Sequence, residues 1–565
     1  MKVSQAVGQT IARMGAAHVF GVVGSGNFRA TNALLEATGP DGQHPQFTAT
    51  RHEMGATCMA DAYTRATGKL SVVTVHQGCG LSNALTGIGE AVKAHTPLLV
   101  ISGDTPGGEY GSNFWIDQDA VIEGMGAIAE RLHSPTRAVT DTMRAITRAQ
   151  MNRVPVVLSM PLDIQESELS KDQEELLASI APPQLPAPAV ASTDSVASVT
   201  RLLADAQRPV ILAGRGGAHA VAPLREIADL SGALLTTSAV GRGLFNEDPW
   251  HMDAMGGFAT DGAAALVQQA DLLVVFGAAL NRWTTRDGTL LQNKTVIQID
   301  DDTTAFGKHY PVNLTILGDT ALTAQAIRDE LNECLSGTPR TGYRTPEVKE
   351  RLAASLHWRD QEYEDNSEPA DESQQGKIDP RTLTNILDDM LPMERVVAPD
   401  GGNFNAYPAM HFRVPDNLGY SLSLGFQSIG LALSTVIGAA FALPDRIAIA
   451  GIGDGGFMMS HVELDTAVRH KIPLVVVVYN DDAYSAEVHH FIHETNNLDT
   501  VVFPETDIAA VARGYGCEAI TVRQASDLDA VRDWTDGPRD RPLVIDAKIT
   551  SFPSWVLAHS FTENE

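Results

Sequence analysis

Basic residues are scarce in this chain. Of its 565 residues, 41 are lysine or arginine and 70 are aspartate or glutamate, which gives a formal net charge of −29. The phosphates of nucleic acids and anionic membrane surfaces repel a protein of this charge, so we expect neither as a partner. A small anionic substrate is not excluded, because local basic groups decide whether it binds.

Cysteine and long apolar runs are scarce as well. The four cysteines, Cys58, Cys79, Cys334 and Cys517, are scattered without metal-site spacing, which is typical of proteins in a reducing cytoplasm. No stretch of about twenty apolar residues predicts a membrane span, and the first residues lack the apolar run of a signal peptide. We therefore predict a cytoplasmic protein that does not use a membrane.

The rest of the composition is ordinary for a globular protein, with 44% apolar and 20% charged residues. A chain of this length predicts about three domains of roughly 150 to 200 residues. Apolar strand patterns alternate with helical patterns, which predicts an α/β fold of three doubly wound parallel sheets. The predicted domains cover residues 1–167, 190–335 and 378–550. A Pro-Ala-rich linker over 182–188 and a polar, acidic linker over 336–377 join them. In the first domain we expect a helix over 3–14 and strands over 18–23, 71–75, 98–101 and 154–160.

The most informative stretch runs from Gly451 to Glu487. An apolar strand leads into four glycines around Asp454, a helical pattern covers 461–470, and an unbroken apolar strand over 474–478 ends in an acidic loop with Asp481. The carboxyl ends of neighbouring parallel strands meet at the edge of the sheet where ligands bind, so Asp454 and Asp481 should face one point. Two carboxylates and a loop carbonyl suit Mg²⁺, which takes its remaining ligands from water and substrate phosphates.

This stretch closely resembles the thiamine-diphosphate motif, in which Gly-Asp-Gly precedes an Asn-Asn pair by the 27 residues that separate Asp454 from Asp481. Asp481 departs from the motif, because it replaces the second asparagine and adds a negative charge at the metal. The resemblance implies thiamine diphosphate and Mg²⁺ as cofactors, with Asp454, Asp481 and Ala483 as the metal ligands. The cofactor-binding residues that it implies are Glu53, Asn83, Gly401, Ile429, Gly453, Asp454, Gly455, Gly456, Asp481, Ala483 and Tyr484.

Two of these residues carry roles that the resemblance assigns to them. The run Arg51-His52-Glu53-Met54-Gly55-Ala56 resembles the Arg-His-Glu-x-Gly-Ala of acetolactate-synthase-like enzymes, whose glutamate contacts the cofactor's pyrimidine. The segment 423–430 resembles the one beneath the cofactor's bend, where Ile429 would be the large aliphatic residue. A helix-start glutamate stabilised by the helix dipole and a core isoleucine are the plainer interpretations. In the family the two domains come from different subunits, so we expect a homodimer at minimum and favour a homotetramer.

The substrate residues mix the features of three subfamilies. The loop with Ser25 and the strand end with His76 resemble benzoylformate decarboxylase, whose serine and histidine meet the substrate, although that enzyme's second histidine falls at Thr284 here. A histidine with a pKa near 6.5 can act as an acid or a base. Glu487 matches the position of the catalytic glutamate of pyruvate decarboxylase, and Gln118 is similar in place to the active-site glutamine of acetolactate synthase. A structural histidine and a solvated helix-face glutamate are the alternatives.

Nearly the whole chain resembles the superfamily of acetolactate synthase, benzoylformate decarboxylase and pyruvate decarboxylase. The resemblance implies non-oxidative decarboxylation of a 2-oxo acid, with release as aldehyde or carboligation. One alternative is an acetolactate-synthase-type carboligase with FAD in the central domain. The glycine turn over 214–217 could serve it, but we interpret that turn as tight packing and do not favour FAD. Another is a hydroxyketone or diketone lyase or hydrolase. A third, of a different class, is a non-catalytic partner subunit.

Overall fold

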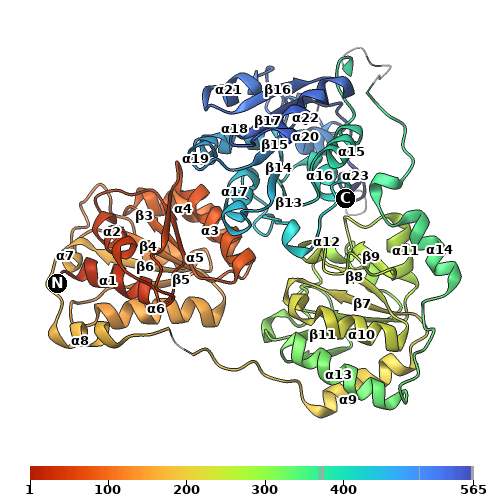
Figure 1. The fold of residues 1–565 in the computed structure, drawn as a ribbon, viewed down its shortest axis with the longest axis horizontal. Coiled ribbons are helices and arrows are strands. Elements are labelled where there is room, and N and C mark those ends of the chain that lie inside the picture. Colours follow the sequence, from red (N-terminus) through yellow and green to blue (C-terminus); the bar gives the residue numbers. More distant parts are fainter. Residues whose placement is uncertain (183, 368–370, 372–373, 496, 561–565) are drawn as a thin grey trace.

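The computed structural model describes residues 1–182, 184–367, 371, 374–495 and 497–560. Three parallel α/β sheets follow one another along the chain, as the ribbon in Figure 1 shows from red to blue. The predicted fold class is therefore confirmed. Among the helices in the described ranges, none combines the length and the apolarity that crossing a bilayer requires.

The N-terminal domain contains a six-stranded sheet in the order β2-β1-β3-β4-β6-β5, with all neighbours parallel. Strands β3 and β4 are buried along their whole length, because helices cover both faces of the sheet. The predicted strands correspond to β1, β3, β4 and β6, and the predicted first helix is α1. The strands are β1 (His18–Gly21), β2 (Gln46–Ala49), β3 (Ser71–Val75), β4 (Leu98–Asp104), β5 (Ile128–Arg131) and β6 (Val156–Pro161). The helices are α1 (Val3–Arg13), α2 (Phe28–Glu36), α3 (Glu53–Thr67), α4 (Cys79–Lys93), α5 (Gln118–Gly124), α6 (Ala138–Asn152), α7 (Leu162–Gln165) and α8 (Lys171–Ser179).

The middle domain contains a second six-stranded parallel sheet, in the order β12-β11-β10-β7-β8-β9. Its glycine turn after β7 packs tightly against the end of β10, since a Cβ on Gly216 would lie 2.9 Å from the Cα of Gly277. Arg215 of this turn donates to the carbonyl of Ala94 in the N-terminal domain. The strands are β7 (Pro209–Ala213), β8 (Leu234–Thr237), β9 (His251–Ala254), β10 (Leu272–Phe276), β11 (Thr295–Asp300) and β12 (Leu314–Leu317). The helices are α9 (Thr193–Asp205), η1 (Arg215–Ala220), α10 (Val221–Ser231), η2 (Ala239–Gly241), α11 (Asp261–Gln269), α12 (Arg282–Thr285), η3 (Thr289–Leu291), η4 (Thr303–Ala305) and α13 (Thr320–Cys334).

The C-terminal domain contains a five-stranded parallel sheet in the order β13-β14-β15-β17-β16. The strands are β13 (Arg395–Pro399), β14 (Ile447–Gly453), β15 (Leu474–Asn480), β16 (Glu518–Val522) and β17 (Leu543–Lys548). The helices are α15 (Pro380–Met390), η7 (Asn403–Asn405), α16 (Ala406–His411), η8 (Asn417–Gly419), α17 (Ala432–Ala442), α18 (Asp454–Ser460), η9 (His461–Glu463), α19 (Leu464–Arg469), α20 (Ser485–Phe491), α21 (Ile508–Gly514), η10 (Ala525–Leu528), α22 (Asp529–Asp536) and α23 (Trp555–Ser560).

The N-terminal and C-terminal domains share one hydrophobic core. Helix α3 packs against α17 across the boundary between the domains, and apolar side chains from both sheets belong to one buried cluster. The backbones approach closely at Gly438, where a Cβ would lie 2.5 Å from the Cα of Met59. Apolar burial on this scale makes the two domains one packing unit.

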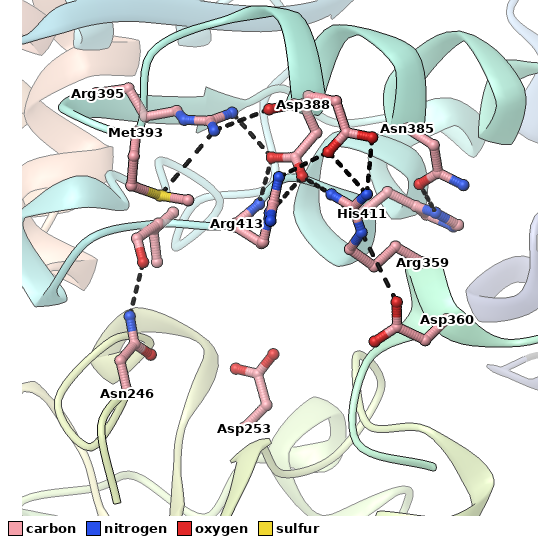
Figure 2. A network of polar contacts seen from close by, with 12 residues as sticks. Asn246, Asp253, Arg359, Asp360, Asn385, Asp388, Met393, Arg395, His411 and Arg413 are labelled. Carbon is pink, nitrogen blue, oxygen red and sulfur yellow. Dashed lines mark hydrogen bonds and ion pairs between the residues drawn. The ribbon is translucent and has the colours of Figure 1, made fainter. Parts of the chain in front are cut away.

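The second linker is partly folded, whereas the sequence predicted a polar connection. It contains α14 (Pro346–Ser355) and η5 (Trp358–Asp360), and Val348 and Leu352 pack into a core of the middle domain. Figure 2 shows where it meets the C-terminal domain. There the fully buried Asp388 accepts hydrogen bonds from Arg359 of the linker, from Arg395 at 2.9 Å and from Arg413 Nε at 2.6 Å. The many charged residues of this segment suggested a linker exposed to solvent, but Arg359 uses its charge in the contact with Asp388.

Candidate functional site

The predicted metal ligands lie at the ends of two neighbouring strands. β14 ends at Gly453, and α18 begins with Asp454. β15, which pairs with β14 so that Gly453 lies opposite Tyr479, ends at Asn480, and Asp481 follows. The sequence predicted a glycine loop over 451–456, but Gly455 and Gly456 belong to the first turn of α18. No loop residue separates β14, which ends at Gly453, from α18, which begins at Asp454.

Burial dominates the electrostatics of this acidic pair. Burial, followed by the nearby charges of Asp481 and Asp482, raises the pKa of Asp454 to about 8. Burial also raises the pKa of Asp481. Oδ2 of Asp481 accepts hydrogen bonds from Ser485 and, at 3.0 Å, from Ser551. Two buried carboxylates at adjoining strand ends offer oxygen ligands of the kind that a hard divalent cation takes.

The glycines around Asp454 allow the strand–helix turn to pack without side chains. A Cβ on Gly453 would lie 2.8 Å from the ring of Phe404, and one on Gly456 would collide with the carboxylate of Asp400. At the start of α18, the N–H groups of Asp454 and Gly455 donate to the carboxylate of Asp454 itself. The glycines leave the main chain of the turn uncovered by side chains, which suits close approach of a diphosphate to a helix start.

Asp400 is a residue that the sequence analysis missed. It is completely buried after β13, and its carboxylate accepts hydrogen bonds from the N–H groups of Gly430 at 2.7 Å and Leu431 at 3.2 Å. Burial raises its pKa to about 6. These bonds fix the loop of Ile429, which packs so closely on Gly401 that a Cβ there would lie 3.2 Å from Ile429 Cγ2. An Asp-Gly-Gly directly after an apolar strand was the available signal.

Glu53 is the first residue of α3, as predicted, and it is almost buried with 8% of its surface exposed. Asn83 of α4, another predicted cofactor residue, donates to Glu53 Oε2 at 3.1 Å. The start of α4 is close as well, since a Cβ on Gly80 would lie 3.3 Å from Glu53 Oε1. A buried carboxylate with one side-chain partner among the described residues has acceptor capacity left for a ligand.

Ser25 and His76 lie together at the carboxyl edge of the N-terminal sheet. They follow β1 and β3, which are neighbours, and Ser25 Oγ is 3.4 Å from His76 Nε2. Phe114 stacks on the imidazole, with the ring centroids 5.1 Å apart. His76 Nδ1 is buried without a hydrogen-bond partner in the described part of the chain. A hydroxyl, an imidazole and an aromatic wall therefore form one small cluster.

The other two predicted catalytic residues make no hydrogen bond to Ser25 or His76 among the described residues, although Gly103, which Gln118 contacts, lies close to Gly26 and Gln77. Gln118, at the start of α5, is 1% exposed, and it accepts from Ser102 Oγ at 2.8 Å and donates to the carbonyl of Gly103 at 3.1 Å. Its amide is thus occupied inside the domain. Glu487 is exposed on α20, in the turn after the acidic loop of the C-terminal domain.

Tyr484 and Ala483 complete the acidic loop. Tyr484 donates its N–H to the carbonyl of Val501 at 2.8 Å, and its ring lies against Gly455. Ala483 forms a bridge with Val502. These contacts tie the loop after β15 to the first turn of α18.

The two halves of the predicted cofactor site belong to different domains of the chain. Within the described ranges, the side-chain hydrogen bond of Glu53 is with Asn83 of its own domain, and that of Asp481 is with residues of the C-terminal domain. Each half of the predicted site is thus organised by side-chain contacts within its own domain.

Comparison with known proteins gives matches over all three domains. Family models described as the N-terminal TPP binding domain, the central domain and the C-terminal TPP binding domain of thiamine pyrophosphate enzymes match residues 1–125, 196–327 and 400–547. Sulfoacetaldehyde acetyltransferase of Alcaligenes xylosoxydans xylosoxydans is 28% identical over 94% of this chain and 89% of its own length. The "Probable 2-ketoarginine decarboxylase AruI" of Pseudomonas aeruginosa is 27% identical over 94% and 91%. The acetolactate synthase large subunit of Parasynechococcus marenigrum is 27% identical over 84% and 76%.

Proposed function

Because the chain belongs to the thiamine pyrophosphate enzymes, which cleave or form a C–C bond next to a carbonyl, we propose that it decarboxylates a 2-oxo acid without oxidation. The product would leave as an aldehyde or be joined to a second carbonyl compound. The observation that carries this proposal is the match of the family models to all three domains, together with Asp454 and Asp481 at the ends of the paired strands β14 and β15.

The C-terminal domain would hold Mg²⁺ and the diphosphate. Asp454, Asp481 and the carbonyl of Ala483 would bind the metal, and the glycine turn from Gly453 would face the phosphates. Asp481 stands where the family pattern has asparagine, so the protein offers the metal one more negative charge. When bound, thiamine diphosphate supplies an electron sink for the bond that breaks or forms beside the carbonyl.

The N-terminal domain would hold the pyrimidine end of the cofactor. Glu53, oriented by Asn83, would contact the ring, and Ile429 would support the cofactor's bend from the other domain. Glu53 and Asp454 belong to different domains, and in similar enzymes these domains come from different subunits, which supports a homodimer whose sites combine two subunits. We favour a homotetramer of such dimers.

Ser25 and His76 would serve the substrate. The hydroxyl of Ser25 can orient the carboxylate of a 2-oxo acid, and His76, 3.4 Å from it, can deliver a proton after CO₂ leaves. Glu487 would approach from the C-terminal domain of the partner subunit. The occupied amide of Gln118 fits a supporting residue of the domain better than a substrate contact.

The relatives support both release of an aldehyde and carboligation, since their names include a decarboxylase, an acetyltransferase and an acetolactate synthase.

All four cysteines are free thiols, which supports the proposed cytoplasmic location.

A panel of aliphatic and aromatic 2-oxo acids tests the function. With Mg²⁺ and thiamine diphosphate, the purified protein should release CO₂ and form an aldehyde or a ketol from at least one of them. Asp454→Ala should fold but lose cofactor retention by calorimetry and lose all turnover. Absence of CO₂ from the whole panel, in a protein that binds the cofactor, would contradict the decarboxylase proposal.

A further inference from the structure

A buried glutamate of the C-terminal domain holds the chain just before Glu53. Glu463, in η9, is 1% exposed, and its Oε1 accepts hydrogen bonds from the backbone N–H groups of Arg51 at 3.0 Å and His52 at 2.9 Å. Its Oε2 accepts from Thr466 Oγ1 at 2.6 Å. Both oxygens are therefore occupied, and neither of the two backbone partners belongs to the glutamate's own domain.

A buried glutamate of the N-terminal domain holds the chain just before Ile429 in the same manner. Glu90, in α4, is also 1% exposed, and its two oxygens accept from the N–H groups of Gly425 at 3.0 Å and Phe426 at 2.8 Å. Arg65 of α3 adds a bond to this segment, because it donates to the carbonyl of Leu422 at 2.9 Å. The loop is thus attached to the opposite domain by its main chain.

The two contacts are reciprocal in their positions along the fold. Glu90 is on the helix that begins beside Glu53 and carries Asn83, and Glu463 follows the helix that begins with Asp454. The two loops that they hold lead into α3 and α17, the helices that pack together across the domain boundary. Each domain therefore contributes one glutamate, placed near its own candidate cofactor residues, that binds a loop of the other domain.

Such carboxylates are costly unless they serve as acceptors. Removing a charged group from water is unfavourable, and burial raises the pKa of both Glu90 and Glu463. Hydrogen bonds to an ionised acceptor are roughly twice as strong as neutral ones, and two of them fix both the position and the direction of a peptide segment. The two carboxylates lose their solvation, and the hydrogen bonds that they accept make the loops more rigid.

We propose that Glu463 and Glu90 are positioning residues that form reciprocal clasps, each fixing the cofactor-contacting loop of the opposite domain. Glu463 acts through the backbone of Arg51 and His52 on the orientation of Glu53, and Glu90 acts through Gly425 and Phe426 on Ile429. This inference rests on the proposed function, because positioning matters only if these loops contact thiamine diphosphate.

The first test needs no cofactor. Amide hydrogen exchange of the apo wild-type protein should show protection at Arg51, His52, Gly425 and Phe426, although all four lie in loops or at a helix start. In Glu463→Gln, protection should fall at the first pair only, and in Glu90→Gln at the second pair only. Unprotected amides at these positions in the wild type would overturn the clasps, whatever the enzyme's activity.

The second test measures the consequence for the cofactor. In the reconstituted holoenzyme, Glu463→Gln and Glu90→Gln should each slow exchange of the bound cofactor's C2 proton about tenfold, with cofactor affinity changed much less. Asp465→Asn is the matched control, because Asp465 also bridges the domains, by an ion pair with the side chain of Arg51 at 2.6 Å, but does not hold the backbone. It should leave the exchange rate at the wild-type value.

The outcomes separate this inference from the proposed function. A wild-type protein that binds no thiamine diphosphate would contradict the function, and amide exchange would then decide the clasps alone. A wild-type protein with rapid C2 exchange, matched by both folded glutamine variants, would overturn the positioning role while the function stands. An equal slowing in Asp465→Asn would also overturn it, because general contact between the domains would then explain the effect.

Discussion

At the scale of single residues, His76 is the side chain best placed for proton transfer. Its Nε2 lies 3.4 Å from Ser25 Oγ, Phe114 covers one face of its ring, and its Nδ1 is buried without a partner in the described part of the chain. A structural histidine would normally use both nitrogens when it is buried. The unused nitrogen therefore favours a role with a ligand present.

Replacing His76 with alanine should lower turnover by about 10² to 10⁴, the range typical of a positioned acid or base, with cofactor affinity nearly unchanged. The product ratio should shift from aldehyde towards ketol, because ligation competes with protonation. Steady-state kinetics and product chromatography measure both effects. His44→Ala, at an exposed histidine, is the control. Wild-type turnover and product ratio in the His76 variant would make this histidine structural.

His251 is a buried histidine with a different consequence, for stability. Burial lowers its pKa from about 6.5 to about 4, so the folded protein binds fewer protons there than the unfolded chain. Its contribution to the free energy of unfolding is therefore complete above pH 6.5 and is lost as the pH falls towards 4. Asp400, whose pKa is raised to about 6, has the opposite effect, so a comparison with a variant is needed.

His251→Gln should remove about 1.4 kcal/mol per pH unit from the slope of unfolding free energy against pH between 6.5 and 4. Urea denaturation at a series of pH values measures this slope. The matched variant His219→Gln changes an exposed histidine and should leave the slope unaltered. Equal slopes in wild type and His251→Gln would show that His251 is protonated in the folded protein or does not titrate in this range.

At the scale of elements, the contact between α3 and α17 depends on the absence of a side chain at Gly438. A Cβ there would lie 2.5 Å from the Cα of Met59, where neither backbone can yield easily. Alanine normally favours a helix by about 1 kcal/mol over glycine, so propensity and packing make opposite predictions for this position.

Gly438→Ala should destabilise the protein by about 1 to 3 kcal/mol or more, because overpacking between two helix backbones outweighs the gain in propensity. Differential scanning calorimetry detects this as a lower Tm. Gly124→Ala is the matched control, since Gly124 is also helical and a Cβ there meets no atom within 4 Å. A Gly438 variant as stable as the wild type would mean that the helices can move apart without cost.

The sequence predicted the elements better than it predicted their contacts. Apolar runs identify β3, β4 and β15, because helices cover both faces of a parallel sheet and its central strands are buried on both sides. Turn residues mark the ends of these runs. The start of α18 at Asp454 was not predicted, because glycines indicate a loop until the strand–helix turn is seen. The linker helix α14 was missed for a related reason: charged residues outnumber the two side chains that pack.

The same limit applies to the site. The predictions for Asp454, Asp481 and Glu53 rest on motifs within their own segments. Glu463 and Glu90 carry no such signal, because their partners are backbone N–H groups 411 or more residues away in one case and 335 or more in the other. A contact with main chain leaves no pattern of residue types, so only the fold reveals it.

At the scale of the whole molecule, the proposed site draws on two domains. Glu53 and Asn83 belong to the N-terminal domain, whereas Asp454 and Asp481 belong to the C-terminal domain, where Asp481 has its side-chain hydrogen bonds. The shared core and the α3–α17 contact join these two domains within one chain. We propose that each site nevertheless combines the N-terminal domain of one subunit with the C-terminal domain of another.

Mixing two inactive variants tests this. The Glu53→Gln and Asp454→Ala homodimers should each be inactive. After the two variants exchange subunits, the mixture should regain about one quarter of the activity of the same amount of wild-type protein. Half of the dimers would then be mixed, and each mixed dimer would have one intact site. Activity is measured before and after exchange, with size-exclusion chromatography to confirm the dimers. No recovery after proven exchange would place both halves in one chain.

The clasps of Glu90 and Glu463 have a consequence for how this protein can diversify. They contact main-chain N–H groups, which every amino acid except proline provides, so the hydrogen bonds themselves do not select a side chain at Arg51, His52 or Phe426. Gly425 is the exception, because a Cβ there would lie 2.9 Å from Lys93 Cβ. Residues at the other three positions can therefore change during evolution or in a mutant library while these hydrogen bonds persist. Side chains near the cofactor can thus vary while the main chain that positions Glu53 and Ile429 stays in place.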